Sequence, residues 1–394
     1  MNELPSSQWQ RRGHVIRVAH VAGFSETSAS GVDRMVFGLV THLESYGVRA
    51  EVWHLSPSHA SVTERRAGSV SVFQLPSRNR GRSALLGLPK ATRSFIRERR
   101  HEIDLLHLHS VFIPDNVWVA QVARRPYVIS PHGGYSPRVL AGSNRIAKFV
   151  WMRMRERGYV RNGSMIHAVS PRELEELRAT FGDRPSVLVP NAIDLPAVVA
   201  APADRMLGPR RRIVFLGRLA IESKGLDVLL EGYASYVTLE RDTDTELVVA
   251  GPDFRSGREE LEALAASLLP PGHVRFTGPL FGREKEALLS SAYVFVHTSR
   301  WEGMPFAVLE ALAMGCPVLV TPATNLGEHI DEFGAGVVVD GSAQSVAEGL
   351  RRILEIPADQ YERLCSAARR LASARFTWPI VAEQMTSEYG KILG

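Results

Sequence analysis

Short runs of β-branched and aliphatic residues alternate along the chain with stretches whose apolar residues recur at helical spacing. In the first half this pattern predicts strands at 15–21, 50–55, 105–109, 127–130, 166–169 and 187–189. Val32, Val36, Leu39 and Leu43 share one helical face, and Gly47 follows as a stop. Strands that alternate with helices predict a parallel sheet with helices on both faces.

The second half repeats the scheme, with strands expected at 213–216, 247–250, 274–277, 293–297, 318–320 and 337–339. Residues 196–212 are rich in Pro and Ala, then basic, and lack periodicity, so they are interpreted as a linker. We therefore predict a disordered lead-in over 1–13 and two successive doubly wound α/β domains, over 14–200 and 201–375, followed by a helix over 376–394. Such sheets bind ligands at the carboxyl ends of their strands, and two of them imply a cleft.

The amino-acid composition limits the classes of protein to which this chain can belong. The 394 residues are 45% hydrophobic, enough for large cores. Two cysteines, Cys316 and Cys365, cannot build a disulfide framework, which favours a reducing compartment. The polar N-terminus lacks the apolar core of a signal peptide, and no apolar run reaches the length of a membrane span. We expect a cytoplasmic protein.

Charge is shared unevenly. Residues 1–200 hold 27 Lys+Arg and 16 Asp+Glu, whereas residues 201–394 hold 20 and 26. The basic half predicts an anionic partner: nucleic acid, an anionic membrane surface or a lipid diphosphate. Residues 148–157 mix Arg with Trp and Met, which suits an anionic bilayer, although an ordinary helix with Trp and Met on the core is the preferred alternative. For the basic stretch 78–100 both alternatives stay open.

Two carboxylates, Glu302 and Glu310, bracket a loop-to-helix turn between two apolar strands, and Gly315 caps the helix. The helix N-terminus offers unpaired N–H groups to an anion such as a diphosphate. Carboxylates would repel that anion, but they accept hydrogen bonds from sugar hydroxyls beside it. Taken alone, the segment also fits an ordinary strand-loop-helix with two surface acids.

Gly217-Arg218-Leu219 and Lys224-Gly225 directly follow the first strand of the second half. Arg offers a planar fork and Lys a mobile point charge, which suits a diphosphate clamp. The alternative is two solvated surface cations. As a clamp residue at the surface, Lys224 is expected to be needed for turnover but not for thermal stability.

Together these two motifs resemble those of the retaining nucleotide-sugar glycosyltransferases of family 4 (group 1), which have the GT-B fold of two Rossmann-like domains facing a central cleft. The resemblance runs from Val15 to the final helix. Gly31 matches a glycine that approaches the donor phosphate, although its usual glycine partner is Ser30 here. Further matches are the strand 104–109 ending in His109, the loop Pro131-His132-Gly133-Gly134 and the segment 189–194.

The resemblance assigns expected roles. Glu310 would hold the ribose and Glu302 the donor sugar, while Arg218 and Lys224 stabilise the departing diphosphate. The remaining donor-binding positions expected are Gly31, Gly217, Gly251, Leu280, Gly303, Met304, Pro305 and Phe306. On the acceptor side, His109, His132 and Gly133 are expected, with His132 orienting the sugar or moving a proton. Retention by same-face attack is implied, rather than double displacement through two carboxylates.

We expect no cofactor and no required metal. Asp242-Thr243-Asp244 has the form of a metal-binding Asp-x-Asp motif from another glycosyltransferase fold, but its charged surroundings favour a solvated loop. No His/Cys cluster has metal-ligand spacing.

The expected reaction moves a hexose from a nucleotide sugar to a glycan or polyprenyl-diphosphate-linked acceptor, in bacterial exopolysaccharide or lipopolysaccharide assembly. Peripheral contact with the inner face of the plasma membrane is expected with it. One alternative is a sugar-nucleotide epimerase of the same fold. Another is a non-catalytic scaffold or nucleic-acid-binding protein, against which stand the acidic second half and the lack of known binding motifs.

Overall fold

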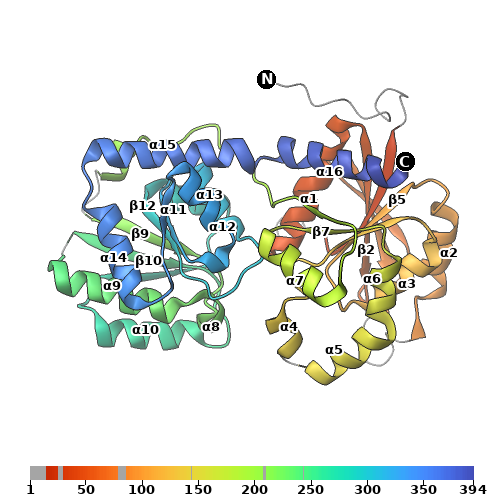
Figure 1. Cartoon of the computed structure of the whole chain (residues 1–394), viewed down its shortest axis with the longest axis horizontal. Helices are drawn as coiled ribbons and strands as arrows, with labels where there is room; N and C mark the ends of the chain where they lie inside the picture. Colours follow the sequence, from red (N-terminus) through yellow and green to blue (C-terminus); the bar gives the residue numbers. More distant parts are fainter. Residues whose placement is uncertain (1–14, 25–29, 79–85, 143, 207–209, 243) are drawn as a thin grey trace. The chain divides into compact units, whose positions relative to one another are not determined.

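The computed structural model describes residues 15–24, 30–78, 86–142, 144–206, 210–242 and 244–394, which form two compact units (Figure 1). The N-terminal unit comprises the described residues up to Ala192 together with Trp378–Gly394, and the C-terminal unit is Ile193–Thr377. Each unit is an α/β domain built on its own sheet. The predicted lead-in, 1–13, lies outside the described residues.

The N-terminal sheet has the order β3-β4-β2-β1-β5-β6-β7-β8. Neighbouring strands are parallel, except that β3 and β4 pair antiparallel. The strands are β1 Ile16–Val21, β2 Val48–Ser56, β3 Thr63–Ala67, β4 Val70–Pro76, β5 Leu105–His109, β6 Tyr127–Ser130, β7 Met165–Ala168 and β8 Ser186–Leu188. The prediction missed β3, a polar and largely exposed edge strand that gives no apolar run, and also β4, although Val70, Val72 and Leu75 of β4 are buried.

Helices connect these strands: α1 Gly31–Leu43, η2 Glu44–Tyr46, α2 Lys90–Arg99, α3 Pro114–Ala123, α4 Pro137–Ala141, α5 Arg145–Trp151, the π-helical turn η4 Met152–Glu156, α6 Arg157–Asn162 and α7 Pro171–Phe181. The last helix, α16 (Trp378–Leu393), packs on α1. Gly38 permits this contact, because a Cβ there would lie 1.9 Å from Cζ2 of Trp378. The last helix of the chain thus forms part of the N-terminal unit and covers α1.

The C-terminal sheet is parallel throughout, in the order β11-β10-β9-β12-β13-β14. Its strands are β9 Arg211–Leu216, β10 Thr245–Ala250, β11 Val274–Gly278, β12 Ala292–His297, β13 Val318–Val320 and β14 Gly336–Val338. All six were predicted within two residues at each end. The chain reverses direction of winding between β9 and β12, so the loops after these two strands flank the switch point where such sheets bind ligands.

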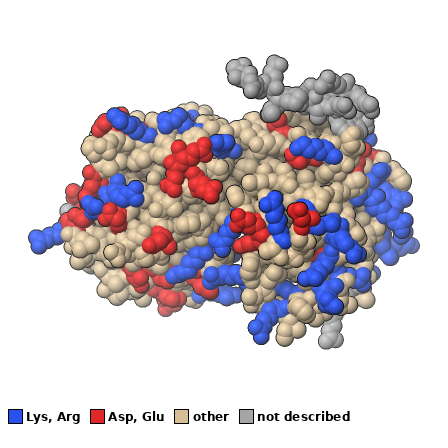
Figure 2. Space-filling model, in the orientation of Figure 1, with Lys and Arg blue, Asp and Glu red and all other residues tan. Residues whose placement is uncertain are grey.

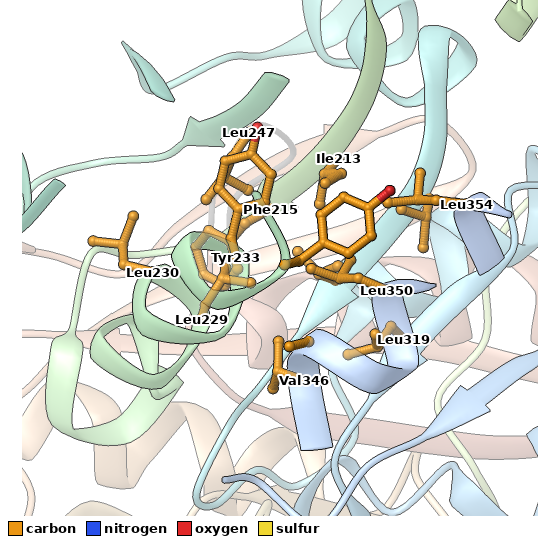
Figure 3. Close-up of a cluster of buried hydrophobic side chains, with 14 of the residues drawn as sticks. Ile213, Phe215, Leu229, Leu230, Tyr233, Leu247, Leu319, Val346, Leu350 and Leu354 are labelled. Atoms are coloured by element: carbon orange, nitrogen blue, oxygen red, sulfur yellow. The ribbon is translucent and has the colours of Figure 1, made fainter. Parts of the chain in front are cut away.

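The helices of this unit are η5 Pro202–Met206, α8 Ile221–Lys224, α9 Leu226–Glu240, α10 Gly257–Leu268, α11 Gly282–Ser291, α12 Phe306–Ala313, η6 Pro322–Thr324, α13 Gly327–Phe333, α14 Ala343–Leu354 and α15 Ala358–Arg375. Helices α9 and α14 pack against each other and the sheet. Figure 3 shows this core, in which Tyr233 and Leu229 of α9 and Leu350 of α14 surround Phe215 of β9. It gives the strand ends a rigid base.

The domain boundary and the linker differ from the prediction. Ile193 donates its N–H to the carbonyl of Phe376 (2.8 Å), and the buried guanidinium of Arg205 donates to the carbonyls of Ala292 (2.7 Å) and Met314 (2.5 Å). Residues 193–206 therefore belong to the C-terminal unit, and the first domain ends at Ala192 rather than at 200. The predicted linker is therefore wrong for residues 196–206 and 210–212, which belong to the C-terminal unit, and residues 207–209 lie outside the described residues.

None of the helices in the described residues is long and apolar enough to cross a membrane.

Candidate active site

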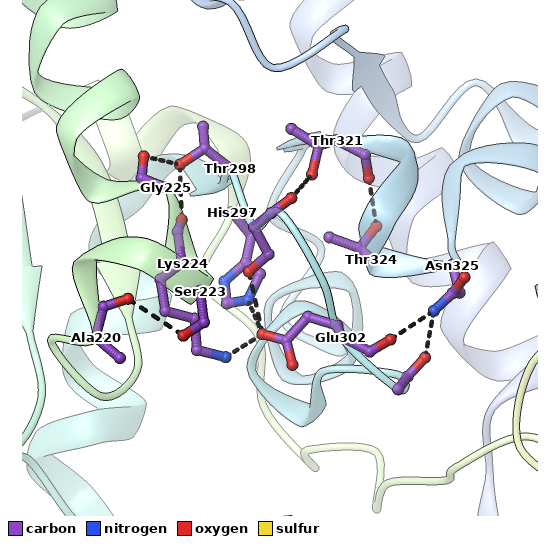
Figure 4. A network of polar contacts seen from close by, with 12 residues as sticks. Ala220, Ser223, Lys224, Gly225, His297, Thr298, Glu302, Thr321, Thr324 and Asn325 are labelled. Carbon is purple, nitrogen blue, oxygen red and sulfur yellow. Dashed lines mark hydrogen bonds and ion pairs between the residues drawn. The ribbon is translucent and has the colours of Figure 1, made fainter. Parts of the chain in front are cut away.

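Glu302 is the centre of a polar cluster in the loop between β12 and α12 (Figure 4). Its Oε1 accepts hydrogen bonds from the ammonium of Lys224, from Nε2 of His297 (3.0 Å) and from Oγ of Ser299 (3.1 Å). Among the described residues all three donors converge on Oε1, and Oε2 receives no hydrogen bond from the protein. The structure thus joins the segment after β9, in which Lys224 ends the short helix α8, to the loop after β12.

The loop that carries Glu302 is held through its backbone. Asn325 donates from Nδ2 to the carbonyls of Glu302 (2.9 Å) and Gly303 (2.6 Å), and Thr321 donates from Oγ1 to the carbonyl of Ser299 (2.5 Å). Asn325 has φ +61°, a conformation that Asn tolerates better than most residues. These bonds fix the carboxylate before any ligand arrives.

The loop that carries Lys224 is held in the same way. Thr298 donates from Oγ1 to the carbonyls of Lys224 (3.1 Å) and Gly225 (2.9 Å). Gly225 has φ +61°, and a Cβ there would lie 2.3 Å from the carbonyl oxygen of Thr298. Glycine is therefore required for the two strand-end loops to approach each other.

Burial and neighbouring charges shift the pKa of Glu302 in opposite directions. Burial raises the pKa of Glu302, but the hydrogen bond from His297 and the positive charge of Lys224 outweigh it and lower that pKa to about 2. Burial lowers the pKa of His297 below the ordinary imidazole value. The cluster therefore holds an ion pair, Lys224 with Glu302, beside a neutral imidazole at pH 7.

The other predicted donor-site residues lie around this cluster. Met304, Pro305 and Phe306 are buried where α12 begins, and Gly303 is half-buried. No side chain among the described residues caps the start of α12. Glu310, one turn into that helix, pairs with Lys285 of α11 (Nζ to Oε1, 2.6 Å).

Arg218 is exposed, with its guanidinium carbon 5.3 Å from the centre of the Phe254 ring. Gly217 and Gly251 pack backbone to backbone: a Cβ on Gly251, whose φ is +150°, would lie 1.8 Å from the carbonyl oxygen of Gly217. Gly251 thus has a structural reason independent of any ligand, whereas a Cβ on Gly217 would lie 3.1 Å from Cζ of Phe215. Leu280 is half-buried after β11.

Sequence reasoning missed His297, Ser299, Asn325 and Lys285. His297 ends a buried strand five residues before Glu302, which is a usable signal for a partner. Asn325 and Lys285 lie on other elements, and only the fold brings them to the site.

A second polar cluster lies in the N-terminal unit. His109 at the end of β5 shares hydrogen bonds with His20 of β1 (Nε2 to Nδ1, 3.1 Å) and with His132 (Nδ1 to Nε2, 3.1 Å). In a second series of hydrogen bonds beside this one, His107 contacts the hydroxyl of Tyr389 (2.6 Å) and Oγ of Ser130 (2.6 Å). Ser130 contacts His167 in turn (2.6 Å).

We call these five residues, His20, His107, His109, His132 and His167, the histidine cluster. Burial lowers the pKa of His20 and of His132 to about 3, and that of His167 to about 4. Burial, reinforced by the neighbouring imidazoles, also lowers the pKa of His107 and of His109 well below the ordinary value. All five are therefore neutral at pH 7.

The loop predicted to lie on the acceptor side, which carries His132 and Gly133, is held by an acid that the sequence did not indicate. His132 has φ +51° and Gly133 φ +77°. Glu173 of α7 accepts the N–H of Gly133 (2.6 Å) and that of Val169 (2.8 Å). Gly31 is the first residue of α1, where Oγ of Ser30 accepts the N–H of Asp33 (3.5 Å).

Among the described residues, the one group of three side chains close enough to hold a metal is His20, His107 and His109. Both nitrogens of His107 already have hydrogen-bond partners, and its ring is stacked on that of His109 with centroids 4.2 Å apart. Stacked rings do not aim their lone pairs at a common point, which makes this a poor metal site.

The Asp-x-Asp motif forms a local turn. Asp242 accepts the backbone N–H groups of Asp244 (3.3 Å) and Thr245 (3.2 Å). Thr243, the middle residue of the motif, lies outside the described residues.

Two facing loops at the switch point of a parallel sheet, in a chain with a second Rossmann-like unit, define a GT-B enzyme. The family description "Glycosyltransferase Family 4" matches residues 29–196 and "Glycosyl transferases group 1" matches residues 206–371. The chain belongs to the group 1 glycosyltransferases and is a glycosyltransferase.

Similar proteins cover the whole chain. GDP-mannose:cellobiosyl-diphosphopolyprenol alpha-mannosyltransferase of Xanthomonas oryzae pv. oryzae is 23% identical over 96% of this chain and 98% of its own length. Phosphatidyl-myo-inositol mannosyltransferase of Mycolicibacterium smegmatis is 25% identical over 96% and 95%. Sucrose-phosphate synthase from Thermosynechococcus elongatus superposes with a TM-score of 0.75 at 19% identity, covering 96% of this chain and 99% of that one.

Proposed function

We propose that this glycosyltransferase moves a hexose from a nucleoside-diphosphate sugar, with retention of anomeric configuration and without a required metal ion. The contact between Lys224 and Glu302 carries the proposal. A sugar nucleotide presents hydroxyls and a diphosphate on the two sides of the bond that breaks. An acid that binds hydroxyls next to a cation that binds phosphate matches that arrangement.

The residues would act as follows. Oε2 of Glu302 accepts a hydroxyl of the donor sugar, while the remaining N–H groups of Lys224 turn to the diphosphate. Negative charge grows on the departing nucleoside diphosphate, and Lys224, Arg218 and the start of α12 stabilise it. Glu310, held by Lys285, accepts the ribose hydroxyls.

Retention would follow from same-face attack by the acceptor. Glu302 is a weak nucleophile, because its pKa is about 2, its negative charge is paired with Lys224, and Oε2 is taken up by the donor hydroxyl in this proposal. A double displacement needs a carboxylate free to attack. His132 is neutral, so it orients a sugar hydroxyl by hydrogen bonding rather than by charge.

For the acceptor we propose a glycan or a polyprenyl-diphosphate-linked sugar in cell-surface polysaccharide assembly, with peripheral contact at the inner face of the plasma membrane. The printed names of two relatives support this, since one names a diphosphopolyprenol and the other a phosphatidylinositol. Both relatives are named mannosyltransferases and the first is named for GDP-mannose, so GDP-mannose is the first donor to test.

The test is a thermal-shift panel of UDP, GDP, ADP, TDP and CMP with their common sugars. A ligand at a hundredfold excess over its Kd stabilises the folded state by about 2.7 kcal/mol. One nucleoside diphosphate should raise the melting temperature of the wild type but not of Lys224→Ala. Silence across the panel would contradict the proposal, and conversion of the donor to another sugar nucleotide without acceptor would identify an epimerase instead.

A further inference from the structure

The helical stretch 145–157 has two opposite faces. Met152 and Glu156, four residues apart, are buried, as are Tyr159 and Val160 just beyond the stretch, and these residues fasten it to the N-terminal unit. Glu156 alone accepts the backbone N–H of Phe112 (3.0 Å), the hydroxyl of Tyr135 and the indole N–H of Trp151. The attachment is therefore complete without the residues on the outer face.

That outer face is apolar. Ile146, Phe149, Val150 and Met154 recur at spacings of three and four residues, and their exposed fractions run from 47% for Val150 to 74% for Ile146. Leaving four large apolar side chains in water on one helical face is unfavourable, and clustered apolar surface of this kind marks a docking site. The expectation that the Met residues of this stretch face the core holds for Met152 and is wrong for Met154.

The apolar face continues into a recess of about 570 Å³ beside it. Phe112, Trp118 and Trp151 contribute to its wall, and Lys148 and Arg155 contribute cations to it. The guanidinium of Arg155 lies 5.2 Å from the centre of the Trp118 ring. Apolar walls with cations among them fit a chain that carries an anionic head group.

Cations surround this face. Residues 137–157 contain six Lys or Arg and one acid, the buried Glu156. In Figure 2, Lys and Arg gather with uncharged surface between them in the region where Figure 1 draws α5. The basic helix α2 differs, because its apolar residues Phe95 and Ile96 are wholly or partly covered and Arg99 is paired with Glu51 and Glu102.

We propose that Ile146, Phe149, Val150 and Met154, with the surrounding cations, form the surface that docks on an anionic bilayer. Apolar side chains would enter the head-group region while Arg145, Lys148, Arg153 and Arg155 meet lipid phosphates. The inference rests on the peripheral contact proposed above, and not on sugar transfer, so the two can fail separately.

The experiment is co-sedimentation of the full chain with vesicles of phosphatidylcholine alone or with about one third phosphatidylglycerol. We expect binding to the anionic vesicles only, and a loss of about tenfold or more in partition for Phe149→Ser with Met154→Ser. The matched control, Val198→Ser with Leu239→Ser, removes two apolar side chains at least as exposed and should bind like the wild type.

A second pair of double variants tests whether the cations around this face contribute to vesicle binding. Arg145→Gln with Arg153→Gln should weaken binding, whereas Arg93→Gln with Arg97→Gln on α2 makes the same change in net charge and should not. Equal losses in both pairs, or no binding by the wild type, would overturn the proposal. So would a concentration-dependent dimer, seen by analytical ultracentrifugation, that Phe149→Ser with Met154→Ser abolishes.

Depth and independence from catalysis can be measured on the same protein. Cys316 and Cys365 are buried, so an environment-sensitive dye on Phe149→Cys should shift to the blue with anionic vesicles, and on Leu239→Cys it should not. The nucleotide thermal shift of Phe149→Ser with Met154→Ser should equal that of the wild type. In the wild type, vesicle binding without any response to nucleotides would count against the transfer proposal alone.

Discussion

The two units carry buried polar clusters of opposite electrostatic design. The histidine cluster holds five imidazoles that burial keeps neutral. They form two adjacent series of hydrogen bonds, one through His109 and one through Ser130. The cluster around Glu302 holds a permanent ion pair. The difference fits the two halves of a sugar transfer, because charge develops on the departing diphosphate while the hydroxyls of an acceptor require only neutral hydrogen bonding.

The largest expected effect is acid sensitivity of the N-terminal unit. The imidazoles have lowered pKa values in the folded state, so the unfolded state binds more protons below about pH 6.5, and stability present above that pH is lost as the pH falls towards 3–4. Each imidazole that stays neutral contributes a slope of about 1.4 kcal/mol per pH unit. Hydrogen exchange, corrected for intrinsic rates, should show the N-terminal unit opening first.

His20→Leu sharpens this prediction. It removes one titrating group and a buried Nε2 that has no partner among the described residues, so it should reduce the slope by about 1.4 kcal/mol per pH unit. His101→Gln, at an exposed position, is the control for replacing a histidine outside the cluster. Equal acid sensitivity in both units would contradict the conclusion that the five buried imidazoles are neutral in the folded protein.

Lys224→Ala should break the charged cluster. Removing one preorganised electrostatic group costs about 10²–10³-fold in turnover. Contrary to the expectation from sequence, the melting temperature should also fall, because Glu302 loses its cation, at a cost of about 1–3 kcal/mol. Lys391→Ala, which removes the cation of the exposed pair with Glu388, should change neither. Unaltered turnover in Lys224→Ala would exclude the proposed role.

Glu302→Gln tests the charge of the carboxylate at nearly constant shape. The pKa of Glu302 is lowered in the folded state, so its contribution is present above about pH 4.5 and is lost as the pH falls towards 2. The wild type should lose about 3 kcal/mol over that range that the variant does not lose. Urea unfolding at stepped pH measures the difference, and parallel curves would show that the pair is not charged.

The smallest expected effect is none at all. Chelation with EDTA should leave turnover unchanged, since we propose that Lys224, Arg218 and the start of α12 stabilise the leaving diphosphate without a metal. A loss of turnover that added Mg²⁺ or Zn²⁺ restores would refute that proposal.

The sequence predicted twelve of the fourteen strands in the described residues and both doubly wound units, because buried parallel strands leave continuous apolar runs. It missed β4 and the polar edge strand β3, and its linker over 196–212, based on Pro, Ala and basic residues, overlooked that Arg205 is buried through carbonyl contacts. At the site, Lys224 and Glu302 were predicted separately. Their contact, and the support from Asn325 and Thr298, depends on three loops meeting at the switch point, which spacing does not encode.

The hydroxyl of Tyr389 in α16, bonded to His107, has a consequence for biosynthesis. The C-terminal unit is one continuous segment, Ile193–Thr377, and can fold as soon as it leaves the ribosome. The N-terminal unit is synthesised first but waits for α16 to close the histidine cluster and to cover α1 at Gly38. The half made first is therefore the half finished last, and translation that stops before Trp378 releases a chain with a complete C-terminal unit and an open N-terminal one.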